Sequence, residues 1–306
     1  MLLRILLATL VLFNTCCRET QNSQNTAGSP AASPKADARI VSLHEVIKKV
    51  EPFFKRMGKP QPADWLTAFH EDGQTFDQWL ASAPTLPTSE RNKIYVLPLG
   101  QFSVQQKKII RITAGYLEAF YGLAVEELPQ RPLNAEFPNV RHSKLMGTRQ
   151  IKTAYLLGTV LPPLLPADGA ALIAFTDQDL YPDETMSYAF GQASLDDRVG
   201  IWSLLRLKDP NFERYLRRTI KIATHETGHM FSMKHCIAYE CVMSGSNHIG
   251  ETDRRPLDAC PECSAKVWWL SNSDPAERYK TLAEYCLRNG LEQVGREFEK
   301  KAAAVK

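Results

Sequence analysis

The chain has 306 residues, of which 37 are Lys or Arg and 34 are Asp or Glu, so its formal net charge is +3. A charge this close to zero argues against nucleic acid as a partner. Hydrophobic residues make up 44% and charged residues 23%, which is typical of a globular protein and excludes a wholly disordered chain. The sequence has no run of about 18 apolar residues that could span a bilayer. Its length predicts one large domain or two small ones.

The first 17 residues have the pattern of an export signal. Arg4 precedes an apolar run over 5–13, which is shorter than a transmembrane helix. The run ends near Cys16 and Cys17, and a signal that ends at a cysteine resembles that of a bacterial lipoprotein, in which the cysteine carries the lipid. We therefore expect residues 1–17 to be a lipoprotein-like signal peptide and Cys16 or Cys17 to anchor an exported protein to a membrane of the cell envelope. Simple secretion after cleavage is the alternative.

The rest of the chain predicts a tether, a helical segment and a mixed sheet. Residues 18–38 are mostly small or polar, which is typical of a flexible tether. Apolar residues at three- and four-residue steps predict a helical segment over 39–89, which either belongs to the fold or acts as an inhibitory pro-segment. The expected strands are then 94–100, 123–128, 170–176, 187–193 and 199–207, and the expected helices are 104–121, 144–160, 211–231, 266–270, 276–288 and 291–301. This order predicts an α/β (α+β) fold, with a mixed twisted sheet covered by helices and a helical C-terminal part.

The long helix over 211–231 carries His225-Glu226-Thr227-Gly228-His229, the H-E-x-x-H signature. Residues four apart on a helix point in nearly the same direction, so His225 and His229 can reach one metal ion. Zinc is the expected metal because it suits imidazole ligands and needs no redox chemistry. Glu226 would lie beside the metal and could accept a proton from water that zinc has acidified to a pKa of about 7. The motif therefore predicts a catalytic zinc site with Glu226 as general base.

His235 is the expected third zinc ligand. It follows His225 by ten residues, so on an unbroken helix it would lie about 15 Å further along the axis, far beyond a Zn–N bond of about 2 Å. The helix must therefore end between His229 and His235 for the three imidazoles to meet. Three protein ligands would leave one coordination position open, as catalytic zinc sites do.

The residues around this motif resemble a known protein family. The H-E-x-x-H motif with His235 is similar to the extended metzincin motif, and the residues that follow resemble the archaemetzincin family in particular: Cys236, Cys241, Met243, Cys260 and Cys263. Upstream stretches at 73–76, 97–100, 176–180 and 190–193 extend the resemblance, which covers most of the chain from about residue 70.

The resemblance implies a metzincin-like zinc peptidase fold with residues 90–306 as the catalytic domain. It also implies Met243 in a turn beneath the catalytic metal and a second zinc on the four cysteines, which makes two zinc ions per chain. One residue departs from the family pattern, because Ser232 stands where the family has a glycine three residues after the second histidine. Glycine suits the left-handed conformation that ends a helix, so Ser232 predicts backbone strain of about 1–2 kcal/mol at this turn.

The four clustered cysteines allow two interpretations. The spacings of Cys236 to Cys241 and of Cys260 to Cys263 fit a closed, structural tetrahedral thiolate site. Disulfides are the alternative for an exported chain, although pairs that close such short loops have unfavourable geometry. Cys286 shares a helix face with apolar residues and is expected to be a buried core residue.

Weaker candidates lie elsewhere in the chain. Asp177 and Asp179 follow an expected strand, where carboxylates commonly cap turns or helices, and His44, His70 and His142 are expected at the surface. His248 is expected in a surface loop, with a hydrogen bond to substrate as the alternative. Tyr188, Phe190 and Ala193 belong to an expected edge strand, and metzincins hold an extended peptide along such an edge by main-chain pairing.

The sequence therefore predicts a zinc-dependent peptidase whose partner is a peptide or protein substrate. The alternative is a zinc-containing, peptide-binding protein that has kept the metal site and lost turnover. Ser232 supports that alternative, whereas the intact Glu226 and three histidines oppose it.

Overall fold

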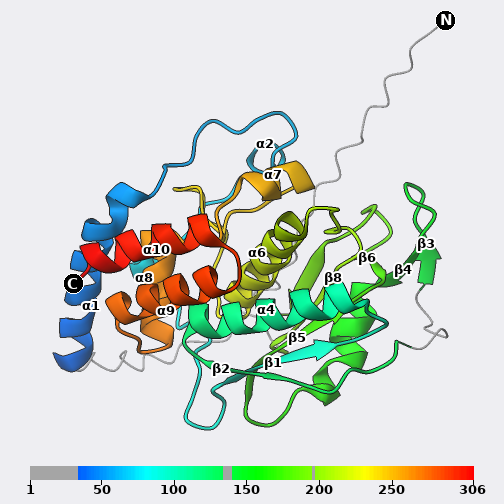
Figure 1. Cartoon of the computed structure of the whole chain (residues 1–306), viewed down its shortest axis with the longest axis horizontal. Helices are drawn as coiled ribbons and strands as arrows, with labels where there is room; N and C mark the ends of the chain where they lie inside the picture. The colour runs from blue at the N-terminus through cyan, green and yellow to red at the C-terminus, as the bar shows by residue number, and fades with distance from the viewer. Residues whose placement is uncertain (1–33, 134–139, 195–196) are drawn as a thin grey trace, which may run out of the picture.

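The computed structural model describes residues 34–133, 140–194 and 197–306 (Figure 1). The signal peptide predicted over 1–17, with Cys16 and Cys17, lies outside the described residues, as does most of the tether predicted over 18–38. Helix α1 (Pro34–Val50) begins inside that predicted tether, so the tether prediction is wrong for residues 34–38. Asp37 in the first turn of α1 favours this start, because a carboxylate stabilises the positive end of the helix dipole.

The predicted mixed sheet is present and, within the described residues, has five strands. Their spatial order is β2 (Ala124–Glu127), β1 (Lys93–Pro98), β5 (Gly169–Thr176), β8 (Val199–Ser203) and β7 (Gly191–Ser194). The first four strands are parallel, and β7 is antiparallel to β8 and forms an edge. The expected strand over 187–193 thus begins later, at Gly191, and the expected strand over 199–207 ends earlier, at Ser203.

Both faces of the sheet are covered. Because side chains alternate along a strand, β5 sends Ile173 and Phe175 into one hydrophobic core and Leu172 and Ala174 into another. The first core includes residues of α4 (Val104–Tyr121) and α6 (Phe212–Met230). The second includes residues of the π-helical turn Leu156–Val160, which follows α5 (Thr153–Tyr155) and leads to the 3₁₀ turn Pro162–Leu164. The α/β fold class predicted from the sequence is therefore confirmed.

A small second sheet contradicts the single helix predicted over 144–160. It consists of β3 (Val140–His142), β4 (Arg149–Lys152) and β6 (Asp179–Tyr181), in that order. The helix prediction is wrong for β4, because Gln150 is fully buried and its amide donates to Ser187 O at 2.9 Å, a tertiary contact that fixes the strand. Such pairing with distant residues overrides local helix propensity.

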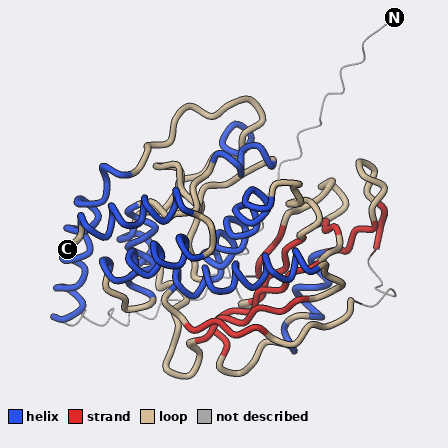
Figure 2. Tube along the Cα trace, in the orientation of Figure 1, coloured by secondary structure: helices blue, strands red, loops and turns tan. Residues whose placement is uncertain are grey.

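The C-terminal part is helical, as predicted. Helices α8 (Pro261–Leu270), α9 (Pro275–Arg288) and α10 (Glu292–Ala304) lie on the side of the molecule away from the small sheet, and α1 lies beside them (Figures 1 and 2). Cys286 on α9 is fully buried, which confirms its predicted place in the core. Within the described part of the chain, no helix has the length and apolar character needed to cross a bilayer.

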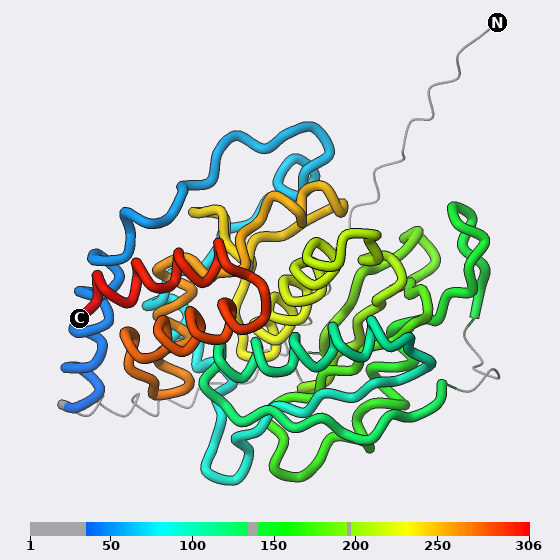
Figure 3. Tube along the Cα trace, in the orientation of Figure 1, coloured from blue at the N-terminus to red at the C-terminus, as the bar shows by residue number. Residues whose placement is uncertain are grey.

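The segment over 39–89 packs into the same core as the residues that follow it. After the 3₁₀ turn Glu51–Phe53 the chain runs along one side of the molecule to α2 (Trp65–Ala68), beside α7 (Ile249–Arg254), and then to α3 (Phe76–Ala81) (Figure 3). Phe76 and Trp79 are fully buried, and Trp79 Nε1 donates to Phe231 O at 2.9 Å. These contacts bring the segment to the end of α6, where the candidate metal ligands lie.

Candidate active site

Helix α6 positions the H-E-x-x-H motif. Asn211 caps its N-terminus by accepting a hydrogen bond from Arg214 N at 2.9 Å, and the helix continues to Met230 as the sequence predicts. His225 and His229 lie one turn apart and both line a cleft of about 600 Å³. Gly228, between them, lies against the Met243 side chain, where an added Cβ would come within 2.5 Å of Met243 Sδ. Met243 thus packs directly beneath the helix, at the place that the resemblance implies.

Ser232 ends the helix in the left-handed conformation predicted for it. Its φ is +61°, and its N–H donates to His229 O at 2.8 Å. The hydroxyl has a specific partner, because Ser232 Oγ accepts a hydrogen bond from Thr85 N at 3.0 Å. The serine therefore fastens the helix end to the N-terminal segment, a contact that glycine could not make.

The three histidines meet beyond this turn. His225 Nε2 and His229 Nε2 are 3.0 Å apart, and a ligand nitrogen of His235 lies within 4.8 Å of both. Two nitrogens on one tetrahedral zinc would be about 3.3 Å apart, so the spacing fits that ion. The three imidazoles therefore lie close enough to share one ion, and their role as zinc ligands stays a prediction.

Each histidine is oriented through its other ring nitrogen. Nδ1 of His225 donates to Val242 O at 2.9 Å, and Nδ1 of His229 donates to Met233 O at 2.6 Å. Because the Nδ1 atoms carry the protons, the Nε2 atoms keep free lone pairs that can bind a metal. Burial, followed by the nearby imidazoles, lowers the pKa of His225 well below its usual value and that of His229 to about 4. Both rings are therefore neutral at neutral pH, the form that coordinates zinc.

Glu71 holds the third histidine, and the sequence analysis missed it. Its Oε1 accepts a hydrogen bond from His235 Nδ1 at 2.7 Å. Burial by itself would raise the pKa of Glu71, but the hydrogen bond and charge of His235 outweigh it, so the pKa is lowered and the group is a carboxylate. A carboxylate behind a metal-binding imidazole fixes its tautomer and strengthens it as a ligand. No local pattern marks Glu71, because it is 164 residues from His235 in the chain.

Glu226 lines the cleft beside the histidines. Its location raises the pKa of its carboxyl to about 7, because burial disfavours the charged form and His235 offsets this only in part. A group with a pKa near neutrality can both accept and release a proton at physiological pH. The geometry therefore allows the general-base role that the sequence predicts.

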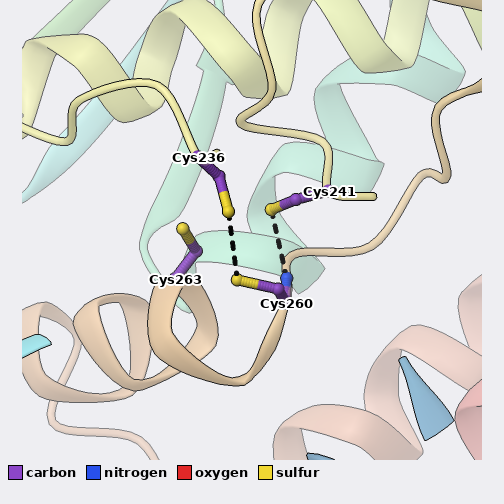
Figure 4. A group of neighbouring side chains, drawn as sticks. All are labelled: Cys236, Cys241, Cys260 and Cys263. Carbon is purple, nitrogen blue, oxygen red and sulfur yellow. Dashed lines mark hydrogen bonds between the residues drawn. The ribbon is translucent and has the colours of Figure 1, made fainter. Parts of the chain in front are cut away.

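The four predicted cysteines lie together in a second cluster, and their side chains point toward one another (Figure 4). All four are buried, and the Sγ atoms of Cys236 and Cys260 are 3.6 Å apart. That separation is close to the value of about 3.8 Å for two thiolates on one tetrahedral zinc and far from a disulfide bond of about 2.05 Å. The arrangement fits a closed metal site and not disulfides.

Backbone groups around the cysteines favour thiolates. Cys241 Sγ accepts hydrogen bonds from Cys260 N at 3.1 Å and Met243 N at 3.4 Å. Hydrogen bonds from the other three cysteines, Cys241 first, lower the pKa of the Cys236 thiol, whereas burial opposes ionisation of Cys241 and Cys260 and raises the pKa of both thiols. Cys236 N also donates to Met243 O at 2.8 Å, so this cluster holds the turn that packs beneath α6.

A third group of possible metal ligands is already occupied by protein cations. Asp64, His248 and Glu251 lie close together, but Arg254 pairs with Asp64 and Arg255 pairs with Glu251 at 2.7 Å. Glu251 Oε2 also accepts from Trp65 N at 2.9 Å. These contacts fasten α2 to α7 and make the group a structural junction.

The weaker candidates take mostly structural positions. His248 caps α7 by accepting from Glu251 N at 3.2 Å, while His70 and His142 are exposed and the half-buried His44 bonds to Asp77. Asp179 is fully buried and pairs with Arg206 at 2.5 Å, so it forms an interior ion pair and not the simple turn or helix cap predicted for it. Asp177 lies against Gly100, and Tyr188, Phe190 and Ala193 line the cleft, although only Ala193 falls within β7.

Known proteins resemble this chain in sequence and structure. The model of peptidase family M54 matches residues 166–268. Archaemetzincin-2 of Pongo abelii is 31% identical over 279 residues, covering 79% of this chain and 77% of that protein. Archaemetzincin of Archaeoglobus fulgidus is 30% identical over 175 residues, which are 57% of this chain and 98% of that protein. The crystal structure of archaemetzincin from Methanopyrus kandleri superposes with a TM-score of 0.50 at 27% identity, over 61% of this chain and 99% of that one. The chain belongs to the archaemetzincin family and is a zinc metallopeptidase.

Proposed function

We propose that the protein hydrolyses peptide bonds with Glu226 as the general base at a zinc held by three histidines. The observation that supports this most directly is the convergence of His225, His229 and His235 beside Glu226 in one cleft. Their Nδ1 atoms are already bound to protein acceptors, so the Nε2 atoms remain for the metal.

The residues of the site divide the chemistry between them. Zinc, when bound, supplies a Lewis acid that acidifies water and polarises a peptide carbonyl. Glu226 accepts the proton of the attacking water on its carboxylate and passes it to the leaving amine nitrogen. The pKa of about 7 suits both steps. Glu71 keeps the His235 ring in the orientation that the metal requires.

The edge strand β7 is the proposed binding strand for the substrate backbone. Gly191, Gln192 and Ala193 line the cleft, and β7 pairs with β8 on its other side. An extended peptide can add to such an edge by main-chain hydrogen bonds.

The second zinc is proposed for the four cysteines, with a structural role. A site with four protein ligands leaves no position for substrate. The burial of all four side chains and the 3.6 Å spacing of Cys236 and Cys260 support this assignment.

The test is Glu226→Gln, measured by peptide cleavage and zinc content. The amide cannot accept the proton, so kcat/KM should fall by about 10²–10⁴-fold while the zinc bound by the histidines remains. Glu213→Gln, an exposed substitution on the same helix, is the matched control and should cleave at the wild-type rate. Cleavage by Glu226→Gln at the wild-type rate would contradict the general-base role.

The alternative of a non-catalytic peptide-binding protein loses its main support in the structure. Ser232 was the reason to consider it, and Ser232 adopts the required left-handed turn and bonds to Thr85. Wild-type protein with full zinc content that cleaves no peptide of a diverse library would nevertheless favour that alternative.

We further propose that the protein is exported and held to a membrane through a lipid on Cys16 or Cys17. The support is the apolar run that ends at these cysteines. Replacing both cysteines by Ser should move the protein from the membrane fraction to the soluble fraction, whereas persistent membrane association would contradict the anchor.

A further inference from the structure

The cleft lining includes two cations that act on each other electrostatically, although most of the lining is neutral. Lys221 and Arg255 line the cleft together with Ile222, Val242, Ser244 and Thr252. Of the described residues that line the cleft, Glu226 alone is acidic. The cations therefore outnumber the acids before any metal charge is added.

Lys221 lies close to the reacting groups. It precedes His225 by four residues on α6, one turn or about 6 Å along the helix axis. The residue is only 4% exposed, and its Nζ donates to Thr252 O at 2.7 Å and Asp253 O at 3.2 Å. An ammonium has three donors, so one remains after these two bonds.

Among the residues that the structure describes, no carboxylate forms an ion pair with Lys221. The Asp253 carboxylate, whose charge acts on Lys221, forms a two-pronged pair with Arg218 through contacts of 2.7 and 2.6 Å. Arg217 and Arg255 add further positive charge around it. Burial first, and then the charge of Arg217, lowers the pKa of Lys221 to about 8, so the ammonium still predominates at neutral pH.

Arg255, which also lines the cleft, has a donor without a partner. Its side chain is buried, with the whole residue 8% exposed, and Nη2 pairs with Glu251. Its Nε is buried and has no hydrogen-bond partner. A buried donor without a partner is unfavourable, and a ligand that accepts a hydrogen bond from it removes that penalty.

We propose that Lys221 and Arg255 form a subsite that takes a carboxylate of the peptide substrate next to the bond that is cut. This inference rests on the proposed peptidase function and adds a substrate class to it. A carboxylate can satisfy several donors at once, and its charge-assisted bonds are the strong ones in a desolvated cleft. The carboxylate belongs either to an Asp or Glu side chain or to the C-terminus of the peptide.

The first experiment uses wild-type protein and three peptides. Two are amidated at the C-terminus and differ only by Glu or Gln at the positions that flank the cleaved bond, and the third carries Gln and a free C-terminus one residue after that bond. We expect the Glu peptide, the free-end peptide or both to exceed the amidated Gln peptide in kcat/KM by about tenfold, which corresponds to about 1.4 kcal/mol. The peptide that is cleaved preferentially shows whether the carboxylate comes from a side chain or from the C-terminus. Equal cleavage of all three would overturn the proposal.

The second experiment tests Lys221 itself. Lys221→Met keeps a long side chain without charge and should reduce the carboxylate preference to less than about threefold, whereas Lys221→Arg should retain it. Arg217→Met removes a charge one turn away on α6, outside the cleft lining, and should keep the wild-type preference. Preservation of the preference in a folded, zinc-loaded Lys221→Met would show that Lys221 does not recognise the carboxylate.

Measurements of peptide binding distinguish a failure of this subsite from a failure of the proposed catalytic function. Calorimetry with zinc-loaded Glu226→Gln measures the affinity of the same three peptides without turnover. A carboxylate preference in binding supports the subsite even if no peptide is cleaved, in which case the proposed catalysis alone fails. Equal affinities would overturn the subsite even if the enzyme is active.

Discussion

His235 and Cys236 are neighbours in the chain, yet they belong to two sites with opposite relations to solvent. The histidines are half-buried and line a cleft with Glu226, whereas the four cysteines are 0–7% exposed and surround one another. The histidine rings donate hydrogen bonds to groups outside the metal site, such as Val242 O and the Glu71 carboxylate. In the cysteine cluster, by contrast, backbone N–H groups of Met243 and Cys260 donate to Cys241 Sγ. One turn of the chain thus carries a candidate catalytic ligand, His235, and is held in place by the buried cysteine cluster that begins at the next residue.

The largest expected effect comes from breaking the closed site. Cys260→Ser should lose the zinc of the cysteine cluster and lower the free energy of unfolding by several kcal/mol, because metal binding to such a site contributes directly to folding. Thermal unfolding and zinc analysis measure both effects. Cys286→Ala is the matched control, because it removes a buried thiol outside the cluster and should keep both zinc ions at a cost of about 1 kcal/mol. Full zinc content in Cys260→Ser would contradict the structural site.

A chelator should remove zinc from the histidine site faster than from the cysteine site. The cleft gives a chelator access to the histidine site, while the cysteine site is enclosed. We expect activity to disappear with the loss of one zinc ion per chain while the circular dichroism spectrum is unchanged. Loss of both ions at one rate, with simultaneous unfolding, would show that the two sites do not differ in their accessibility to the chelator.

A smaller effect is expected at the partner of His235. Glu71→Ala removes the carboxylate behind the imidazole and should weaken zinc binding at the histidine site by about 10–100-fold. The zinc affinity of Glu71→Gln should lie between that of the wild type and that of Glu71→Ala. Competition with a zinc indicator measures the affinity. Asp72→Asn changes the exposed neighbouring carboxylate and should have no effect. Wild-type affinity in Glu71→Ala would mean that the backbone alone orients His235.

The smallest effect is expected at the turn between the two sites. Ser232→Gly relieves the left-handed strain but loses the hydrogen bond to Thr85, and since each is worth about 1 kcal/mol the change should be nearly neutral. Ser232→Ala keeps the strain and loses the bond, so it should be about 1 kcal/mol less stable than Ser232→Gly. Denaturant unfolding measures both. An alanine variant as stable as the glycine variant would show that the turn is not strained.

The sequence predicted the parts of the site that are local in the chain. α6, the three histidines and the four cysteines follow from spacings within 39 residues, from His225 to Cys263, and helix geometry converts such spacings into directions. Glu71, Lys221 and Arg255 acquire their roles from contacts between distant segments. Their residue types are common on any surface, so no pattern distinguishes them.

The same distinction holds for the fold. Strands β1, β5 and β8 are continuous apolar runs and were predicted. β4 was predicted as a helix because its pairing with β6 and the burial of Gln150 depend on residues about thirty positions away. Asp179 was assigned to a turn because the sequence does not show that Arg206 would neutralise it in the interior.

The hydrogen bond between Glu71 and His235 has a consequence for the order of folding. It joins residues 164 positions apart, whereas α6 needs only contacts within a turn. Closing so long a loop costs conformational entropy that local helix formation does not, and contacts of large sequence separation form slowly. The His235 ring should therefore be among the last groups to take its final position, after His225 and His229 on α6. In refolding experiments at saturating zinc, helical signal should return before zinc capture at the cleft, and the delay between them should shorten in Glu71→Ala, in which the contact with His235 does not form.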